Sequence, residues 1–500
     1  MSDSTTEVIR RALAAPAVHA NGFDAHAHLR GVLRGVGLAP EDSGGAIQFT
    51  GQDPVIASVF RIASAAGIGL VAKSVAMAAL WRHRGGAGQD IAMDLRRAPH
   101  RLCPFYDRKW ELINGYPPRN TADPDSPFTL KFYETADARW VMPLNLYPRI
   151  KSSALRLLNC SDSEAAVAQA IRGWKGRELE EASAQAGIVM PMLRSVEEFM
   201  EEPQYLDVLR SLPLIEIERI GDSAPEPFTP NPQRPLDGVR ALGLARVIAG
   251  AGTGRTLALH GADVLNVWPP SDFESDLLYA TANVGVRSAL LDVADRENGG
   301  FARMQALLAG ADVFYANRRQ GYLERRGLSA QQAAAARPGI IHASISLHGE
   351  TGPFANRPGF DQTAGCVTGV MTLEGSPSKP KLPVIMVVND YLGAWLLTTG
   401  IVAALMRRAH EGGSYRVHVS LTRLSLWLYT LGLFDKGFAH ATANSCEAHR
   451  YLDPEVFMAE TPMGLYQGVT DQVCMSLTPG HYRQVLVPRG SSRAEWLRRG

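Results

Sequence analysis

Apolar positions follow two different periods along the first part of the chain. Residues 54–81 form an Ala-rich apolar stretch that ends in basic residues followed by Gly85-Gly86, which predicts a buried helix with a glycine stop. Alternation of apolar and polar residues over 90–95 predicts a strand after it. A hairpin within 127–148 and a helix near 173–187 come next. Together these elements predict a small α+β unit.

Five prolines in residues 221–235 interrupt this pattern. Because proline removes a backbone donor and favours extended chain, the segment predicts a linker. From Leu236 onward, short apolar strands alternate with helices, which is typical of β-α-β units around a parallel sheet. The expected strands are 239–244, 263–267, 289–293, 312–315 and 340–345. The predicted fold class is therefore α/β, with a Rossmann-like parallel sheet that carries helices on both faces, plus the small α+β domain.

The chain also repeats a helix, a glycine turn and a strand in the same order, which indicates a diverged duplication. The matched strings are Ala78-Ala79-Leu80 with Ala403-Ala404-Leu405, 90–95 with 417–421, and Phe132-Tyr133 with Leu465-Tyr466. The expected units are an N-terminal segment whose order the pattern leaves open (1–50), a degenerate first copy (51–220), the proline-rich linker (221–235), a large domain (236–435) and a partial small domain (436–500).

Composition and charge exclude several classes of protein. With 51 Lys and Arg against 50 Asp and Glu, the net charge is +1, so no basic field attracts nucleic acid or anionic lipid. The five cysteines are an odd number without C-x-x-C spacing, which argues against a disulfide framework and a zinc site and favours a reducing cytoplasm. Neither of the two most apolar stretches holds about 20 uninterrupted apolar residues, so no membrane span is expected.

One string near the N-terminus is similar to the first metal-binding strand of amidohydrolases. It is Asp24-Ala25-His26-Ala27-His28, in which alternating histidines on a strand could share a metal. The residues before it, Ala20-Asn21-Gly22, are not the apolar run that such a strand needs, and no later partner set of histidines and a lysine follows. We expect an N-terminal loop here and no metal site.

A glycine turn is expected at Ala249-Gly250-Ala251-Gly252-Thr253-Gly254-Arg255-Thr256, between a predicted strand and the start of a helix, the geometry in which backbone N–H groups face an anion. Its spacing differs from the G-x-G-x-x-G of dinucleotide sites. The second strand also ends at Trp268-Pro269-Pro270, where a dinucleotide site carries an acidic residue. A nicotinamide cofactor is therefore not expected.

A series of short strings stands in one order between residues 235 and 405. The strings include Pro235-Leu236-Asp237-Gly238-Val239, Arg246-Val247-Ile248-Ala249-Gly250, His260-Gly261-Ala262-Asp263-Val264, Gly321-Tyr322-Leu323-Glu324-Arg325, Arg357-Pro358-Gly359-Phe360-Asp361 and Asn389-Asp390-Tyr391-Leu392-Gly393. In this order they resemble the class III CoA-transferase family, also called the CaiB/BaiF family, which includes formyl-CoA transferases and α-methylacyl-CoA racemases. Residues 54–205 resemble a later part of the same polypeptide, so the order is rotated in this chain.

The resemblance implies an aspartate nucleophile at the start of the long second-copy helix, which is Asp390 here. A carboxylate that attacks a thioester gives a mixed anhydride, which the departing CoA thiolate can reopen before another carboxylate exchanges with the acyl group. The alternative is that Asp390 only caps a buried helix. Alignment of the two Ala-Ala-Leu triplets puts Ala65 at this position of the first copy, and alanine cannot act as a nucleophile. We therefore expect the first copy to be structural.

The resemblance also implies contacts with CoA. The residues concerned are Arg246, Ile248, Ala249, Gly250, Leu291, Asn317 and Arg325. Arg325 could pair with a phosphate as a charged fork, or it could be an ordinary exposed helix arginine. Asn266, Trp268 and Pro269-Pro270 stand where the family has basic and acidic residues after the second strand, which puts the binding of the CoA diphosphate or adenine there in doubt.

The function implied is CoA transfer between an acyl-CoA and a free carboxylic acid by a cytoplasmic homodimer, with the CoA thioester as substrate and no prosthetic group. One alternative is an acyl-CoA racemase or isomerase. That branch of the family uses a histidine immediately before Asp361, where this chain has Phe360. His348 lies at a different motif position, and we expect it to be a solvated loop histidine. A second alternative is a non-catalytic acyl-CoA-binding pseudoenzyme, suggested by the altered segment 266–270 and by the first copy without a nucleophile.

Overall fold

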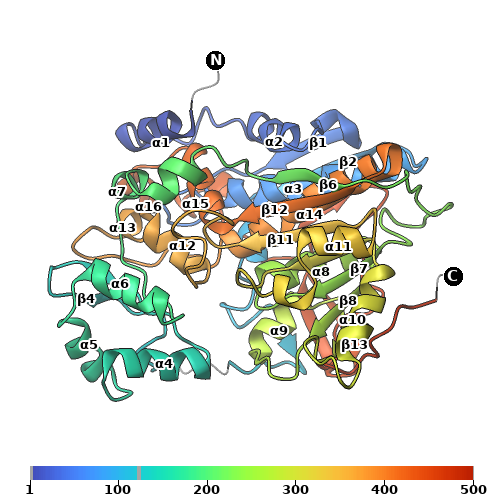
Figure 1. The fold of residues 1–500 in the computed structure, drawn as a ribbon. Helices are drawn as coiled ribbons and strands as arrows, with labels where there is room; N and C mark the ends of the chain where they lie inside the picture. The colour runs from blue at the N-terminus through green and yellow to red at the C-terminus, as the bar shows by residue number, and fades with distance from the viewer. Residues whose placement is uncertain (1–3, 121–124, 499–500) are drawn as a thin grey trace.

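Seven strands form the central sheet, in the order β6-β12-β11-β10-β7-β8-β9. The computed structural model describes residues 4–120 and 125–498 (Figure 1). The strands are β6 Glu216–Gly221, β7 Arg240–Leu244, β8 Asp263–Trp268, β9 Arg287–Leu290, β10 Val313–Ala316, β11 Ile341–Ser346 and β12 Ser414–Ser420. Neighbours from β9 to β12 pair in parallel, and β6 is antiparallel to β12. In chain order the parallel strands are arranged 3-2-1-4-5-6, the Rossmann order, which confirms the predicted fold class.

Helices cover both faces of this sheet because its strands are apolar on both sides. Ala241 and Val264 belong to one buried cluster with Leu257 of α8, while Leu242 and Leu265 belong to another with Leu307 of α10. The helices that follow the strands are α8 Ala249–Leu259, α9 Asp276–Ala282, α10 Gly300–Ala309, α11 Ala330–Ala336, α12 Asp361–Val367, α13 Val370–Glu374, α14 Asn389–Glu411, α15 Leu421–Thr430 and α16 Lys436–Thr442. Continuous apolar strands of this kind are expected of a parallel sheet between two helical layers.

The predicted strand at 289–293 is displaced, since β9 ends at Leu290. The carboxylate of Asp292 accepts the N–H of Ala294 at 3.0 Å, a local turn that competes with further pairing. The helix predicted from residue 54 also begins later, as α3 Ile62–His83. There the Asp53 carboxylate accepts the N–H groups of Ala63 and Ser64 and so satisfies the first turn of α3.

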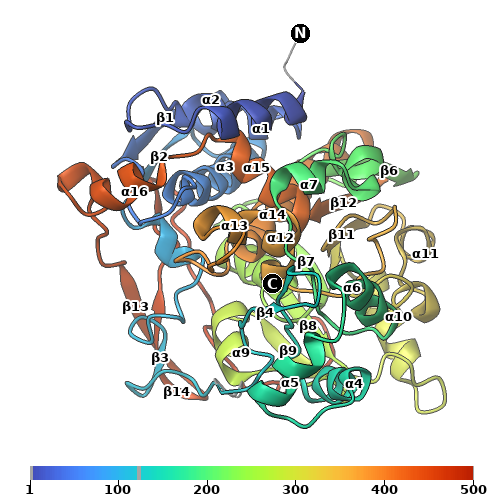
Figure 2. The same cartoon turned by 90° about the vertical axis from the view of Figure 1, so that its left-hand side faces the viewer.

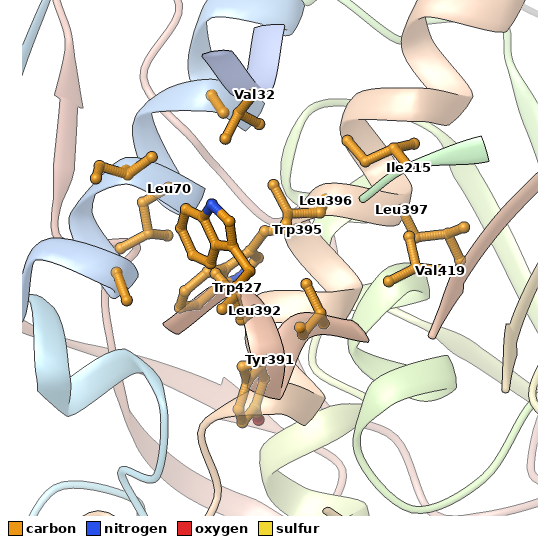
Figure 3. Close-up of a cluster of buried hydrophobic side chains, with 14 of the residues drawn as sticks. Val32, Leu70, Ile215, Tyr391, Leu392, Trp395, Leu396, Leu397, Val419 and Trp427 are labelled. Carbon is orange, nitrogen blue, oxygen red and sulfur yellow. The ribbon is translucent and has the colours of Figure 1, made fainter. Parts of the chain in front are cut away.

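The helices α3 and α14 lie against each other in the largest core of the protein. Figure 3 shows Leu70 of α3 near Leu392, Trp395 and Leu396 of α14. A Cβ at Gly69 would lie 2.5 Å from a methyl carbon of Leu392, so glycine permits the close approach. By length and composition α3 is long and apolar enough to span a membrane, and its apolar window is completely buried inside the protein. It is a core helix.

The N-terminal segment is folded onto this core through α1 Thr5–Ala14 and α2 Ala25–Arg34. Ile9 and Leu29 are fully buried. The expectation of a loop at Asp24-Ala25-His26-Ala27-His28 is wrong, because Asp24 is the N-cap of α2 and accepts the N–H of Ala27 at 3.0 Å. His28 stacks on the ring of Phe23, which lies just before the string.

A second sheet has three strands, and its arrangement resembles part of the first. It consists of β1 Gly44–Thr50, β2 Gln89–Asp94 and β15 Val473–Met475. β2 follows α3 and lies between a parallel and an antiparallel neighbour, as β12 does after α14. This agreement supports the duplication of the helix and strand. The later part of the repeat differs, because β4 Tyr133–Glu134 pairs with β5 Trp140–Val141, whereas β14 Gly464–Val469 lies between β13 Val456–Thr461 and β3 Leu112–Ile113.

A small lobe with its own apolar core precedes the central sheet in the chain. It contains β4, β5, α4 Pro148–Leu158, α5 Glu164–Ile171 and α6 Gly176–Gln185, and α7 Val196–Met200 leads back to the main body. The predicted hairpin is confirmed only over β4 and β5, and Phe128 is a buried core residue outside any strand. Arg357 of the main body pairs with the buried Glu180 of α6 at 2.8 Å. Figures 1 and 2 show the lobe beside the sheet, in front of β7 and β8 in Figure 2.

Candidate active site

Asp390 is the second residue of α14. Its backbone N–H is capped by another side chain, and its own carboxylate does not cap the helix. Its N–H donates to the Asp361 carboxylate at 2.8 Å, and the side-chain amide of Asn389 donates to the other oxygen at 3.0 Å. Among residues 4–120 and 125–498, no side chain donates a hydrogen bond to the Asp390 carboxylate in this structure. The alternative explanation, that Asp390 only caps the helix, therefore does not apply, because Asp361 is the residue that caps α14.

Burial makes both carboxylates hard to ionise. The pKa of Asp390 is raised well above its ordinary value, first by burial and then by the charge of Asp361. Burial also raises the pKa of Asp361, although the N–H groups around it oppose the shift. Two close carboxyl groups of this kind titrate as a pair, and the second proton is lost with difficulty. An ionised Asp390 in this site would be a poorly solvated and reactive carboxylate.

An aromatic wall made of Tyr147 from the small lobe and of Phe273 and Phe360 from outside it lies next to this pair, since Phe360 directly precedes Asp361. The ring of Tyr147, just before α4, stacks on Phe360 at 6.0 Å and meets Phe273 edge-on at 5.9 Å. Burial raises the pKa of Tyr147 well above its ordinary value, and the charges of Glu274 and Asp390 contribute to the same shift. Tyr147 is therefore within electrostatic reach of Asp390. No motif or periodicity around Tyr147 points to this role.

The Glu274 carboxylate connects Tyr147 of this wall with the segment after β7 through two hydrogen bonds. One oxygen accepts the Tyr147 hydroxyl at 3.0 Å, and the other accepts the N–H of Val247 at 2.8 Å. Val247 has a positive φ of 60°, which is rare for a β-branched residue and indicates a strained turn held by its surroundings. Burial raises the pKa of Glu274. The contact joins residues far apart in the chain, and sequence reasoning missed it.

The glycine-rich segment is part of a helix, which corrects the prediction of a turn. α8 begins at Ala249, and its glycines are buried. A Cβ at Gly254 would lie 2.2 Å from the Tyr315 hydroxyl, and one at Gly252 would lie 3.3 Å from Cβ of Ala394. The glycines let α8 fit between the sheet and α14. Their G-x-G-x-G spacing reflects packing.

Five of the predicted CoA-contact residues come together at the carboxyl ends of β7 and β10. The N–H of Arg246 donates to Asn317 Oδ1 at 2.9 Å, and Asn317 Nδ2 donates back to the Arg246 carbonyl at 2.8 Å. A Cβ at Gly250 would lie 2.6 Å from the Asn317 side chain, and Ile248 and Ala249 are buried beside them. Leu291 follows β9 at the edge of the sheet, and Arg325 is exposed in the short helix Glu324–Arg326. Contact of these residues with CoA stays a prediction.

A cavity of about 400 Å³ opens beside these residues, between the segment after β10 and the segment after β11. Asn317, Arg319 and Gly359 are among its lining residues, while Asp390 is not. Gly359 leads directly to Phe360 and Asp361, so this segment joins the cavity wall to the carboxylate pair. A volume of this size is typical of a small-molecule site.

His348 is buried and not in solvent as expected. Its Nδ1 lies 2.8 Å from the Thr422 hydroxyl, and burial lowers its pKa to about 3, so it is neutral at pH 7. With Phe360 before Asp361, no histidine occupies the position that the racemase branch would use.

Residues 236–487, half of the chain, match the sequence model of CoA-transferase family III. The chain belongs to CoA-transferase family III. It is 31% identical over 216 residues to acetyl-coenzyme A transferase nodX of Hypoxylon pulicicidum, which covers 41% of this chain and 36% of that protein. It is 30% identical over 210 residues to succinate–glutarate CoA-transferase of Agrobacterium fabrum, which covers 38% of this chain and 52% of that protein.

Among solved structures, a CaiB/BaiF family protein from Brucella suis is 27% identical to this family III chain. The alignment has a TM-score of 0.35 and covers 46% of this chain and 65% of that one. The chain therefore spans about half or less of the length of the curated relatives named above.

Proposed function

We propose that this chain transfers CoA between an acyl-CoA and a free carboxylic acid, with Asp390 as the nucleophile. The observation that carries the proposal is that Asp361 caps α14 and leaves the buried Asp390 carboxylate without a structural partner. A buried carboxyl group with a raised pKa and no structural duty is characteristic of a functional site. Membership in CoA-transferase family III supports the same reaction.

The proposed reaction conserves the energy of the thioester in covalent intermediates. An oxygen of Asp390 attacks the thioester carbonyl carbon, a C–O bond forms, and the C–S bond breaks to release CoA thiolate. The thiolate then attacks the aspartyl carbonyl, which gives an aspartyl-CoA thioester and frees the first acid. The acceptor carboxylate attacks this thioester and releases CoA thiolate, which leaves a second mixed anhydride between Asp390 and the acceptor. The thiolate then attacks the acceptor's carbonyl carbon in that anhydride, so that the new C–S bond forms, the C–O bond to Asp390 breaks and the Asp390 carboxylate is restored.

Surrounding residues have defined parts in this proposal. Asp361 fixes the backbone of Asp390, and the N-terminus of α14 stabilises negative charge on the attacking side chain. Tyr147 and Phe360 form an apolar wall that limits the access of water, which would otherwise hydrolyse the anhydride. The homodimer implied by the family resemblance and a cytoplasmic location belong to the same proposal. What supports the location is the set of five unpaired cysteines.

The test is an exchange assay with isotopically labelled carboxylic acids and a panel of acyl-CoAs, in which the label is followed into the CoA thioester by liquid chromatography. The proposal predicts label transfer with at least one pair and none without enzyme. A parallel reaction in deuterated water without an acceptor acid detects a racemase through exchange of the α-proton. Deuterium uptake without label transfer, or binding of acyl-CoA without either reaction, would contradict the proposal.

A further inference from the structure

Three polar side chains on neighbouring strands of the central sheet form a hydrogen-bonded row, Ser346, His418 and Glu216. The Nε2 atom of His418 lies 2.8 Å from Ser346 Oγ, and its Nδ1 atom is hydrogen-bonded to the Glu216 carboxylate. A serine, an imidazole and a carboxylate linked in this order can make the serine hydroxyl nucleophilic, because the imidazole accepts its proton and the carboxylate balances the resulting charge. The row therefore has the connectivity of a catalytic triad.

The register of the strands places the three side chains on one face of the sheet. Glu216 of β6 pairs with His418 of β12, and His418 pairs with Ser344 of β11, two residues before Ser346. Because successive residues of a strand point to opposite faces, these four residues share a face. Val419, the next residue after His418, points to the other face, where Figure 3 shows it beside α14. The row thus lies on the face away from α14, and each of its members belongs to a strand.

The hydrogen bonds around the row indicate where its protons lie. A carboxylate only accepts hydrogen bonds, so the glutamate of the row accepts the Nδ1 proton of His418 and leaves Nε2 as an acceptor. The N–H of Gly349 donates to Ser346 Oγ at 3.0 Å, so the hydrogen of the hydroxyl itself is free to be donated to Nε2. A second carboxylate, that of Glu350, lies 4.0 Å from Nε2, but it is paired with Arg416 at 2.6 Å. His418 can therefore act as the base for Ser346.

The serine of the row borders open space, while its base is protected from water. Ser346 lines the cavity of about 400 Å³, and His418 is only 1% exposed. Glu350 and Thr351 line the same cavity, and their backbone N–H groups donate no hydrogen bond to residues 4–120 and 125–498. Backbone N–H groups of this kind can stabilise the oxyanion that forms when a nucleophile attacks a carbonyl group. The cavity thus brings together a nucleophile, a buried base and backbone donors.

We propose that Ser346, His418 and Glu216 form a second active site, which hydrolyses an ester or thioester of a short carboxylic acid. Ser346 Oγ attacks the carbonyl carbon while His418 Nε2 takes the hydroxyl proton, and the C–O or C–S bond of the substrate breaks as the leaving group takes that proton. Water then attacks the acyl-serine and gives a proton to His418, the acid leaves, and the proton returns to Ser346. A short acid fits the size of the cavity. This activity does not rest on the proposed transfer reaction, because Asp390 takes no part in it.

The first test is labelling with diisopropyl fluorophosphate, in which the Oγ–P bond of an activated serine forms and fluoride leaves. Intact-mass spectrometry and peptide sequencing should find one adduct, on Ser346, in the wild type and none on this residue in Ser346→Ala. The labelling rate should be about a hundredfold or more lower in His418→Gln and in Glu216→Gln. The matched control is Ser344→Ala, since Ser344 lies on the same face and lines the same cavity but donates to Glu350 at 2.9 Å, and it should be labelled at the rate of the wild type. Thermal unfolding checks that each variant is folded.

The second test measures hydrolysis of p-nitrophenyl acetate and of acetyl-CoA without an acceptor acid, in an Asp390→Asn background. This background removes the proposed transfer nucleophile, so failure of the transfer reaction is seen separately. Release of p-nitrophenol alone assigns an ester substrate, release of CoA assigns a thioester, and either should be lost in Asp390→Asn/Ser346→Ala. The site would be overturned by a folded wild type without label on Ser346, by equal labelling rates in the wild type and His418→Gln, or by hydrolysis of neither probe.

Discussion

The N-termini of α14 and α3 are both capped by a buried aspartate from another segment, and only α14 carries a second carboxyl group beside the cap. Asp361 accepts the N–H of Asp390 at 2.8 Å, and Asp53 accepts the N–H of Ser64 at 2.7 Å. Both capping carboxylates are buried, and each closes the first turn of a long buried helix. Only α14 has a second carboxylate beside its cap. The counterpart of Asp390 is Ser64 by this hydrogen bond and Ala65 by the alignment of the Ala-Ala-Leu triplets, and neither carries a carboxylate. The capping carboxylate is common to both helices and serves the fold. Asp390 is an additional buried carboxyl group that stabilises nothing visible in the described part of the fold, so a catalytic role accounts for it better than a structural one.

Of the substitutions that test this distinction, Asp390→Asn should have the largest effect on the transfer rate. It keeps the size of the side chain and the capped backbone but removes the nucleophile. We expect the rate of CoA transfer to fall about a thousandfold or more, as loss of a covalent catalyst does, with the melting temperature unchanged or higher. The measurement is kcat in the exchange assay together with calorimetric unfolding. Retention of transfer in the folded variant would remove Asp390 from the mechanism.

The reverse substitution, Ala65→Asp, asks whether the first copy lacks only the carboxylate. Ala65 is fully buried, so an aspartate there would have to leave water, and Arg61, the cation at the N-cap of α3, already interacts with the Asp53 carboxylate. We expect a loss of about 3 kcal/mol or more in the free energy of unfolding and no additional transfer activity. Urea unfolding at pH 7 gives the stability. A gain of activity in Asp390→Asn/Ala65→Asp would show that the first copy is a latent site.

The two caps can be removed in parallel as Asp361→Ala and Asp53→Ala. Each leaves buried N–H groups without an acceptor, so each should cost about 1–3 kcal/mol of stability. Only Asp361→Ala should change catalysis. Without the charge of Asp361 the pKa of Asp390 falls, and the acidic limb of the kcat/KM profile should move to lower pH. Equal pH profiles for the wild type and Asp361→Ala would contradict the coupling of the two carboxylates.

The smallest expected effect is in the pH dependence of stability. The folded pKa of both Asp361 and Asp390 is raised above the ordinary value of 3.8, so the folded state binds more protons than the unfolded state above that pH. The free energy of unfolding therefore falls as pH rises from 3.8 toward the folded pKa values, by up to about 1.4 kcal/mol per pH unit for each group. Asp390→Asn should show a shallower slope in urea unfolding between pH 4.5 and 7.5 than the wild type, which retains the pair.

The order of strands and helices and the position of Asp390 could be predicted from patterns within short segments of the sequence. Alternating strands and helices after Leu236 gave the Rossmann-like sheet, and the motif around Asp390 gave its place at the start of a long helix. The glycines of α8 were assigned to a turn because their spacing is a local signal, while their neighbours Tyr315 and Ala394 come from distant elements. The same limit explains why Tyr147 and Glu274 were missed.

The first copy was harder to interpret because its fold depends on contacts with the second. The helix α3 is apolar on all sides, and nothing in its own sequence shows that it packs on α14 or that Asp53 closes its first turn. The repeat could still be recognised from its helix and strand. Its later part could not be aligned correctly, since β14 and β15 lie in different sheets.

The most direct test of the central claim is intact-mass spectrometry of the wild type and Asp390→Asn after incubation with a panel of acyl-CoAs, with hydroxylamine to trap any activated carboxyl group. The account predicts a covalent mass shift only in the wild type, with the hydroxamate mapped by peptide sequencing to Asp390. Binding of acyl-CoA without any adduct or hydroxamate, or an adduct that persists in Asp390→Asn, would contradict it.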